Sequence, residues 1–182
     1  MNFTTTPIAG LVVIEPKIWR DNRGEFLETY NEDLFKENGV DQHFVQDNQS
    51  LSQRGSLRGL HAQASPNAQG KLVRVISGRV MDVAVDIRTN SPTFGQTFHI
   101  ELNAADAKML WIPVGFLHGF IALEDHTIFA YKVTAKYDKA SEIGVRYDDP
   151  AFNIQWPLGP EELVLSEKDL QLPLLKDIEN PF

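Results

Sequence analysis

The stretch KLVRVISGRVMDVAVDI, residues 71–87, decides the fold class. Two runs rich in β-branched residues flank the turn signal Ser77-Gly78, which predicts a β-hairpin with arms at residues 71–76 and 80–87. Apolar residues alternate along the second arm and share one face of the strand, namely Met81, Val83, Val85 and Ile87. The stretch therefore indicates a sheet that packs against a core.

Outward from this stretch, short strand-like runs recur between turn signals along most of the chain. They cover residues 11–14, 26–30, 43–50, 57–63, 96–102, 109–112, 118–123 and 127–134. Many short strands separated by Gly, Pro and Asn turns are typical of an all-β sandwich or barrel. A jelly roll satisfies the pattern best, and the periodicity alone leaves a Greek-key sandwich open.

Two segments depart from the strand pattern. A short helix is predicted at residues 32–37, with Asn31 as its N-cap and Gly39 as its stop. The last part of the chain, residues 157–182, is rich in Pro, Leu and Glu. We expect it to form short helical turns on the outside of the sheets.

Length and composition narrow the class of protein. The 182 residues, 42% of them apolar, predict one domain spanning residues 1–182 with a full core. The net charge of −8 argues against a nucleic-acid binder. No apolar run approaches the roughly 18 residues that span a bilayer, and we see no signal peptide. The absence of cysteine excludes disulfides and thiolate metal sites and fits a cytoplasmic location.

The run LRGLHAQ, residues 57–63, supplies the first candidate for chemistry. Strand alternation places Gly59, His61 and Gln63 on one face. A lone histidine in such a strand is more often a hydrogen-bonded core residue than a catalytic one, so further residues are needed.

Two more runs give His61 a context. Residues 71–78, KLVRVISG, and residues 113–118, PVGFLH, together with the first run resemble the two motifs of the cupin superfamily. Metal-binding cupins have a second histidine and a glutamate where this chain has Gln63 and Lys71. A cation at a ligand position repels a divalent metal, and an amide is a poor ligand beside imidazole. We therefore expect no metal, although His118 is retained.

A lysine and a histidine in one cavity suit a different chemistry. A neutral histidine acts as a general base near pH 7, and a lysine stabilises a developing oxyanion. Proton abstraction next to a carbonyl requires this pair. The base also needs a partner that holds its tautomer.

The order and spacing of the motifs resemble the dTDP-4-dehydrorhamnose 3,5-epimerase family over nearly the whole chain. The matching stretches are residues 21–28, 46–50, 55–61, 69–75, 82–88, 91–95, 111–116, 118–120, 131–134 and 165–169, with Glu142 and Asp149-Pro150. The resemblance implies a cupin-type jelly roll that acts on a dTDP-linked 4-keto-6-deoxy sugar without a redox cofactor. It also implies a homodimer in which N-terminal strands cross to the neighbour.

The resemblance implies roles for individual residues. His61 is similar to the family's base and Asp169 to the carboxylate paired with it. Lys71 resembles the residue that stabilises the enolate oxygen, and Tyr131 the acid that returns a proton from the opposite face. Tyr137 resembles the aromatic that stacks on thymine. The remaining substrate-binding positions are Arg23, Phe26, Glu28, Gln46, Asn48, Arg58, His118, Glu142 and Lys168.

Three details of the sequence limit this interpretation. Arg58 and His61 have opposite strand parity although both should reach the ligand, which requires a bulge or a turn before the strand. Ala62 stands where the family commonly has an aromatic, and we expect this to alter packing rather than chemistry. Leu117 stands where a smaller residue is usual, and its bulk is expected to trim the cavity.

Other functions remain open at this stage. The nearest alternative is a monofunctional 3- or 5-epimerase, or a ketoisomerase, acting on a related dTDP-4-keto-6-deoxy sugar. A metal-dependent cupin oxygenase is disfavoured by Gln63 and Lys71. A non-catalytic carbohydrate-binding jelly roll is disfavoured because binding alone needs no acid and base pair.

Overall fold

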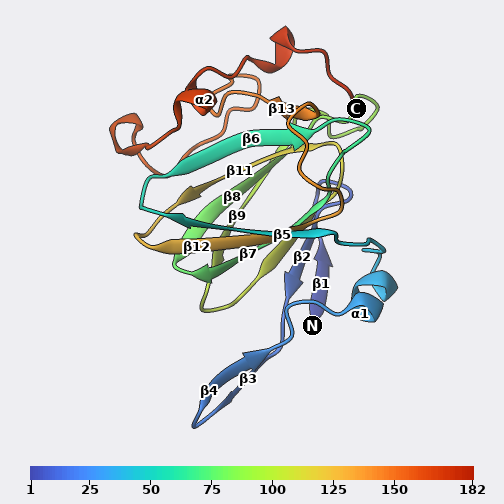
Figure 1. Ribbon diagram of the computed structural model, residues 1–182, viewed down its shortest axis with the longest axis vertical. Helices are drawn as coiled ribbons and strands as arrows, with labels where there is room; N and C mark the ends of the chain where they lie inside the picture. Colours follow the sequence, from blue (N-terminus) through green and yellow to red (C-terminus); the bar gives the residue numbers. More distant parts are fainter.

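The chain forms thirteen short antiparallel strands, eleven of which make up two large sheets (Figure 1). The computed structural model describes residues 1–182. The six-stranded sheet contains, in spatial order, β1 (Asn2–Thr5), β2 (Val12–Glu15), β10 (Met109–Ile112), β7 (Lys71–Ser77), β12 (Thr127–Val133) and β5 (Gln46–Ser52). The five-stranded sheet contains β13 (Glu142–Gly144), β6 (Leu57–Gln63), β11 (Phe116–Ala122), β8 (Arg79–Asp86) and β9 (Thr97–Asn103). The predicted all-β, cupin-type jelly roll is confirmed.

The predicted hairpin of residues 71–87 is wrong, although both of its strands exist. Strand β7 pairs with β10 and β12, whereas β8 pairs with β11 and β9 in the other sheet. The chain crosses between the sheets at Gly78, which has a φ of 78°. Val73 and Val80 meet in one core cluster between the sheets. The two arms thus bury their apolar side chains by facing each other rather than by pairing edge to edge.

The outer face of the five-stranded sheet is also buried. Val83, Val85 and Ile87 of the predicted alternating arm form a second cluster with Leu60 and Phe152. The C-terminal segment covers this face with two short 3-10 turns, η1 (Pro160–Glu162) and η2 (Leu175–Asp177), and helix α2 (Glu167–Leu170) (Figure 1). The expectation of helical turns packed on the outside is therefore confirmed.

A third cluster lies under the predicted helix. Helix α1 (Glu32–Glu37) begins after Asn31, whose side chain accepts a hydrogen bond from the Leu34 amide at 3.2 Å. Its Phe35 is fully buried and packs with Trp111 and other residues of the six-stranded sheet. Neither of the two α-helices has the length and apolar character needed to cross a membrane.

A β-bulge resolves the parity conflict between Arg58 and His61. His118 of β11 is opposite His61 and Phe120 is opposite Arg58, so two residues of β6 face the single Gly119 of β11. The extra residue rotates the strand and turns both side chains toward the same side. Gly59 in the bulge has a φ of 130°, and a Cβ there would lie 2.6 Å from the Cα of Gly119. Both glycines are therefore required by space.

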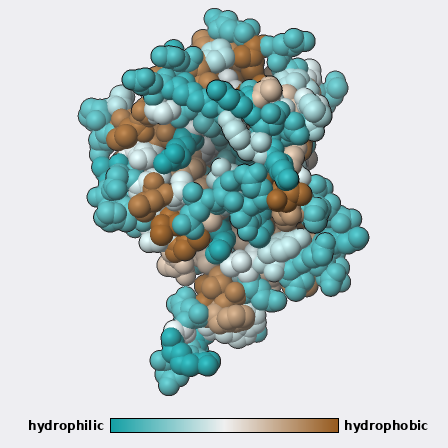
Figure 2. Space-filling view, in the orientation of Figure 1, coloured by the Kyte–Doolittle hydropathy of each residue, from teal (hydrophilic) through white to brown (hydrophobic).

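A two-stranded hairpin, β3 (Ile18–Asp21) and β4 (Gly24–Leu27), projects from the two sheets (Figure 1). The strand predicted at residues 26–30 ends at Leu27, and β3 was not predicted. Trp19 is 42% exposed and Phe26 is 67% exposed. Figure 2 shows apolar surface where the hairpin leaves the body and a hydrophilic tip beyond it.

The bulge makes a testable demand on stability. We expect Gly59→Ala to lower the free energy of unfolding by more than about 2 kcal/mol, because the new Cβ meets backbone atoms that cannot move aside. Urea denaturation measures the change. Gly95→Ala is the control, since Gly95 also has a positive φ but nothing lies within 4 Å of its Cβ position. Equal losses in both variants would contradict the argument from space.

Candidate active site

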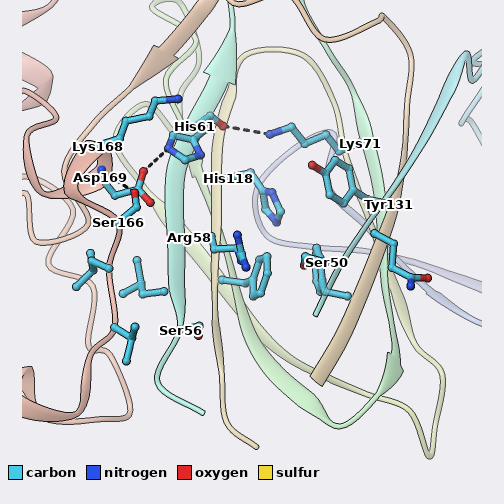
Figure 3. Close-up of a pocket in the computed structure, with 16 residues that line it drawn as sticks. Ser50, Ser56, Arg58, His61, Lys71, His118, Tyr131, Ser166, Lys168 and Asp169 are labelled. Atoms are coloured by element: carbon cyan, nitrogen blue, oxygen red, sulfur yellow. Dashed lines mark hydrogen bonds and ion pairs between the residues drawn. The ribbon is translucent and has the colours of Figure 1, made fainter. Parts of the chain in front are cut away.

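A cavity of about 570 Å³ opens between the two sheets and is closed on one side by the C-terminal segment (Figure 3). Its walls come from β5 and β12 of one sheet, β6 and β11 of the other, and residues 164–169. Seven of the predicted site residues are among its lining residues, namely Arg58, His61, Lys71, His118, Tyr131, Lys168 and Asp169. His61, for which strand alternation specified a face but not its direction, therefore points into the space between the sheets.

The histidine of β6 and the aspartate of α2 form a direct pair. The Nε2 atom of His61 lies 2.7 Å from Oδ1 of Asp169. Asp169 is held in place because α2 is capped by Ser166, whose Oγ accepts a hydrogen bond from the Asp169 amide at 3.1 Å. Burial raises the pKa of Asp169, but the hydrogen bond and charge of His61, the hydrogen bond with Ser166 and the charge of Lys168 together outweigh burial and leave the pKa below its usual range. The residue is thus an ionised acceptor.

This pairing fixes the tautomer of the histidine. An ionised carboxylate only accepts hydrogen bonds, so the proton of neutral His61 resides on Nε2. The other ring nitrogen, Nδ1, is left with a free lone pair, and the ring points into the cavity (Figure 3). His61 therefore presents a base to whatever occupies the cavity.

The lysine at the start of β7 is set deep in the same space. Its Nζ donates a hydrogen bond to the carbonyl oxygen of His61 at 3.2 Å. Burial lowers the pKa of Lys71 to about 8, and the negative charges of Asp82 and Glu142 only partly oppose this effect. The amine is a cation near neutral pH that is poorly hydrated, so its charge acts strongly on a nearby oxygen.

A second histidine–carboxylate pair lies behind the first. Nε2 of His118 is 2.9 Å from Oδ2 of the fully buried Asp82. Burial lowers the pKa of His118, while Asp82 opposes the shift and Lys71 and His61 add to it. The ring is thus neutral, with the Nε2 proton directed at Asp82 and Nδ1 free to accept a hydrogen bond.

The tyrosine of β12 comes from the sheet opposite His61. Figure 3 shows Tyr131 and His61 on different walls, with their polar atoms directed into the shared space. The Tyr131 hydroxyl makes no hydrogen bond within the chain. Burial raises the pKa of Tyr131, and the positive charge of Arg58 partly opposes this shift. Its phenol is therefore protonated and available as an acid.

A smaller cavity of about 280 Å³ shares His61, Lys71 and Tyr131 with the first. Its other predicted residues are Gln46, Asn48, Tyr137 and Glu142. The amide of Gln46 donates to Asn48 Oδ1 at 2.8 Å, and both residues line this cavity. Lys168 and the Tyr137 hydroxyl bind the two oxygens of Glu142 at 2.6 and 3.1 Å. The two cavities thus lie on either side of the base and share its wall.

Comparison with known proteins identifies the family. A family model described as dTDP-4-dehydrorhamnose 3,5-epimerase matches residues 5–177. The chain belongs to this family of isomerases. It is 47% identical over 180 residues to the dTDP-4-dehydrorhamnose 3,5-epimerase of Methanothermobacter thermautotrophicus, covering 98% of this chain and 96% of that protein.

Two solved structures are similar throughout. The dTDP-4-dehydrorhamnose 3,5-epimerase of Elizabethkingia anophelis has a TM-score of 0.94 and 45% identity, covering 99% of this chain and 98% of that chain. A dTDP-6-deoxy-D-glucose-3,5-epimerase of Legionella pneumophila, in complex with dTDP-4-keto-L-rhamnose, has a TM-score of 0.94 and 49% identity. The latter match covers 98% of this chain and 94% of that chain.

Three positions that the family resemblance assigned to the substrate lie away from the cavity. Arg23 and Phe26 are on the projecting hairpin, and Glu28 follows it. None of the three lines either cavity of its own chain, because β4 belongs to neither large sheet. Their assignment to the substrate therefore stays a prediction.

Three positions that stood out in the sequence have structural explanations. Ala62 and Leu117 differ from the family's usual residues, and Gln63 differs from the metal-binding cupins. Leu117 and Ala62 are buried in the cluster on the outer face of the five-stranded sheet. The bulk of Leu117 therefore does not trim the cavity, contrary to our expectation. Gln63 donates to the carbonyls of Asn67 and Lys136 and accepts from the Asp138 amide. Its side chain thus organises a loop.

Several residues of the site were not predicted from the sequence. Asp82, which lies behind the lining of the cavity, is the main one. Its charge inside an apolar strand is the signal that could have indicated it. Others are polar or aromatic residues whose direction depends on sheet packing, namely Gln49, Ser50, Ser56, Phe120, Phe129 and Ser166. Ser50 has a buried hydroxyl without a partner.

The buried lysine predicts a pH dependence. A lysine is charged below its pKa, so Lys71 loses its charge as the pH rises through about 8. We expect the Nζ resonance of Lys71 to titrate near this value in NMR, and the rate of the enzyme to fall over the same range. Lys71→Met identifies the resonance by its absence. A titration near 10.5, the ordinary lysine value, would contradict the role of burial.

Proposed function

We propose that this chain epimerises dTDP-4-keto-6-deoxy-D-glucose at carbons 3 and 5 to give dTDP-4-keto-L-rhamnose. The observation that carries the proposal is a histidine–carboxylate pair and a protonated tyrosine on opposite walls of a cavity with a buried lysine. Inversion at a carbon next to a keto group needs a base on one face, an acid on the other and a positive group at the oxygen.

The first step is proton removal. Nδ1 of His61 takes the proton from carbon 5. The electron pair of the broken C–H bond forms a double bond between carbons 5 and 4, and the π electrons of the carbonyl move onto the keto oxygen to give the enolate. Asp169 stabilises the imidazolium that results, since it lies 2.7 Å from Nε2. The charge at the enolate oxygen is compensated by the Lys71 ammonium in its desolvated position.

The second step returns a proton to the other face. Tyr131 gives its phenolic proton to carbon 5, the enolate collapses to the ketone, and the configuration is inverted. His61 then passes its proton to solvent and Tyr131 regains one from solvent, so the base is restored. His61 next takes the proton from carbon 3, which is also next to the keto group. Water supplies the new proton there, and the hydroxide that remains takes the proton from the imidazolium. His118 is a neutral hydrogen-bond acceptor for a sugar hydroxyl. No electrons are gained or lost overall.

The smaller cavity and the cations beside it suit the nucleotide. Tyr137 is exposed beside Glu142 and provides an aromatic face for stacking on thymine. Arg58 and Lys168 are cations at the cavity wall that match the charge of a diphosphate. Gln46 and Asn48 are amides that fit the remaining polar groups. The proposal treats the whole chain as one catalytic domain, because these residues come from its beginning, middle and end.

We further propose that two copies of the chain complete each other's sites. The hairpin β3–β4 leaves the body of its own chain with Trp19 and Phe26 exposed. Strand β5, which carries Gln46 and Asn48, has an unpaired edge at the end of the six-stranded sheet. A partner's hairpin on this edge would bring Arg23 and its neighbours to the smaller cavity, which Gln46 and Asn48 line.

Solvent deuterium wash-in tests the reaction. Incubation with the keto sugar in heavy water should place label at carbons 3 and 5 of the product, as followed by mass spectrometry and NMR. His61→Ala should abolish exchange at both carbons while the protein remains folded. The absence of label with the unmodified enzyme would contradict the proposal. Label at one carbon alone would identify a monofunctional epimerase instead.

Mixing two defective variants tests the shared site. A variant with Arg23→Ala and Phe26→Ala lacks the hairpin contacts, and His61→Ala lacks the base. Random pairing of equal amounts makes half of the dimers mixed, each with one intact site, so we expect about one quarter of the normal rate. Mixed dimers that form, as judged by mass spectrometry, but remain inactive would contradict the exchange of hairpins.

A further inference from the structure

Strand β13 lies between the base and the C-terminal segment. Its residues Glu142, Ile143 and Gly144 pair with β6, and Gly144 is directly opposite His61. Gly144 is not among the glycines with positive φ, so its backbone conformation is open to other residues. The reason for a glycine at this position must therefore be space.

The missing side chain leaves room for two neighbours. A Cβ on Gly144 would lie 2.6 and 2.9 Å from the two methyl carbons of Leu172 and 3.3 Å from Cδ2 of His61. The first two distances are shorter than van der Waals contact. Leu172 and the edge of the imidazole thus share the space above Gly144.

The C-terminal segment is near the imidazole at two points. Asp169 binds Nε2, and Leu172, three residues further along the chain, fills the space above Gly144 that Cδ2 of the ring also borders. One hydrogen bond leaves the plane of an imidazole free to tilt about that bond. A leucine seated over Gly144 takes up room into which the edge of the ring could tilt, and so limits the direction of Nδ1.

Further contacts hold the segment on both sides of Asp169. Before it, Lys168 binds the carboxylate of Glu142 at 2.6 Å. After it, the carbonyl oxygen of Pro173 accepts a hydrogen bond from the Arg146 amide at 3.0 Å. Strand β13 and Arg146, two residues beyond its end, therefore act as a template against which the segment is aligned.

We propose that Gly144 and Leu172 are positioning residues that set the ring plane of His61 for proton abstraction. The inference rests on the proposed role of His61 as the base. Neither residue touches the substrate, and both act through the imidazole. Placing a base within a few tenths of an ångström matters because a displacement of about 1 Å can lower a rate on the order of 100-fold.

The experiment compares three variants of the full-length protein. Gly144→Ala adds a methyl group that displaces Leu172 or the imidazole, and we expect kcat to fall on the order of 10- to 100-fold. The dissociation constant for dTDP should stay within about twofold, since the nucleotide contacts are elsewhere. Leu172→Ala alone should lower kcat by a smaller factor. Leu172→Ala added to Gly144→Ala should restore most of the loss, because it reopens the space.

A matched control separates positioning from general disturbance. Gly159 has an ordinary φ of −67° and lies on the same segment. The Cβ that Gly159→Ala adds meets the flexible side chain of Glu161. This variant should leave kcat unchanged. Urea denaturation of each variant shows whether it is folded at the assay temperature. If Gly144→Ala is not folded, Leu172→Ala still tests the proposal, because it introduces no clash.

NMR of the His61 ring nitrogens gives a readout that is independent of turnover. The Gly144→Ala variant should change the chemical shifts of the His61 ring nitrogens, and the double variant should restore them. Unchanged shifts and kcat, or a loss that Leu172→Ala does not relieve, would overturn the inference. A lack of exchange by the unmodified enzyme would instead refute the proposed function, while the ring nitrogen shifts would still test the packing.

Discussion

The hydrogen bond between His61 and Asp169 is the interaction on which the rest of the site depends. It joins residues 108 positions apart and ties a strand of the jelly roll to a segment outside it. Without the carboxylate, neither nitrogen of the imidazole would have a defined protonation state. In the proposed mechanism, the C-terminal segment thus takes part in catalysis as well as covering the sheet.

The structure holds that segment at several points before and after the helix that carries Asp169. The amide of Leu57 donates to the carbonyl of Val164 at 3.0 Å, and the amide of Leu175 donates to the buried carboxylate of Asp149 at 2.6 Å. These contacts fix α2, which has only four residues and would not be stable alone. Tertiary contacts therefore supply what helix propensity cannot.

Charge is distributed to serve the cavity in a molecule of net charge −8. Buried Asp82 is near enough to favour the charged form of Lys71, although desolvation still lowers the pKa to about 8. The same carboxylate holds His118 in one tautomer. One buried acid thus supports two groups at the site. Its Oδ2 is satisfied by His118, whereas its buried Oδ1 has no hydrogen-bond partner within the chain.

The sequence alone determined the local structure and the chemical types at the site. Alternation, turn residues and the Asn31 cap are local signals, so most strands and helix α1 were predictable. The placement of β7 and β8 in different sheets was not predictable, since alternation specifies a face of a strand but not the strands beside it. Asp82, the placement of Phe26 outside the cavity and the fit of Leu172 over Gly144 depend on contacts between distant segments. Only the tertiary structure decided these features, because the relevant energies arise between surfaces that meet after folding.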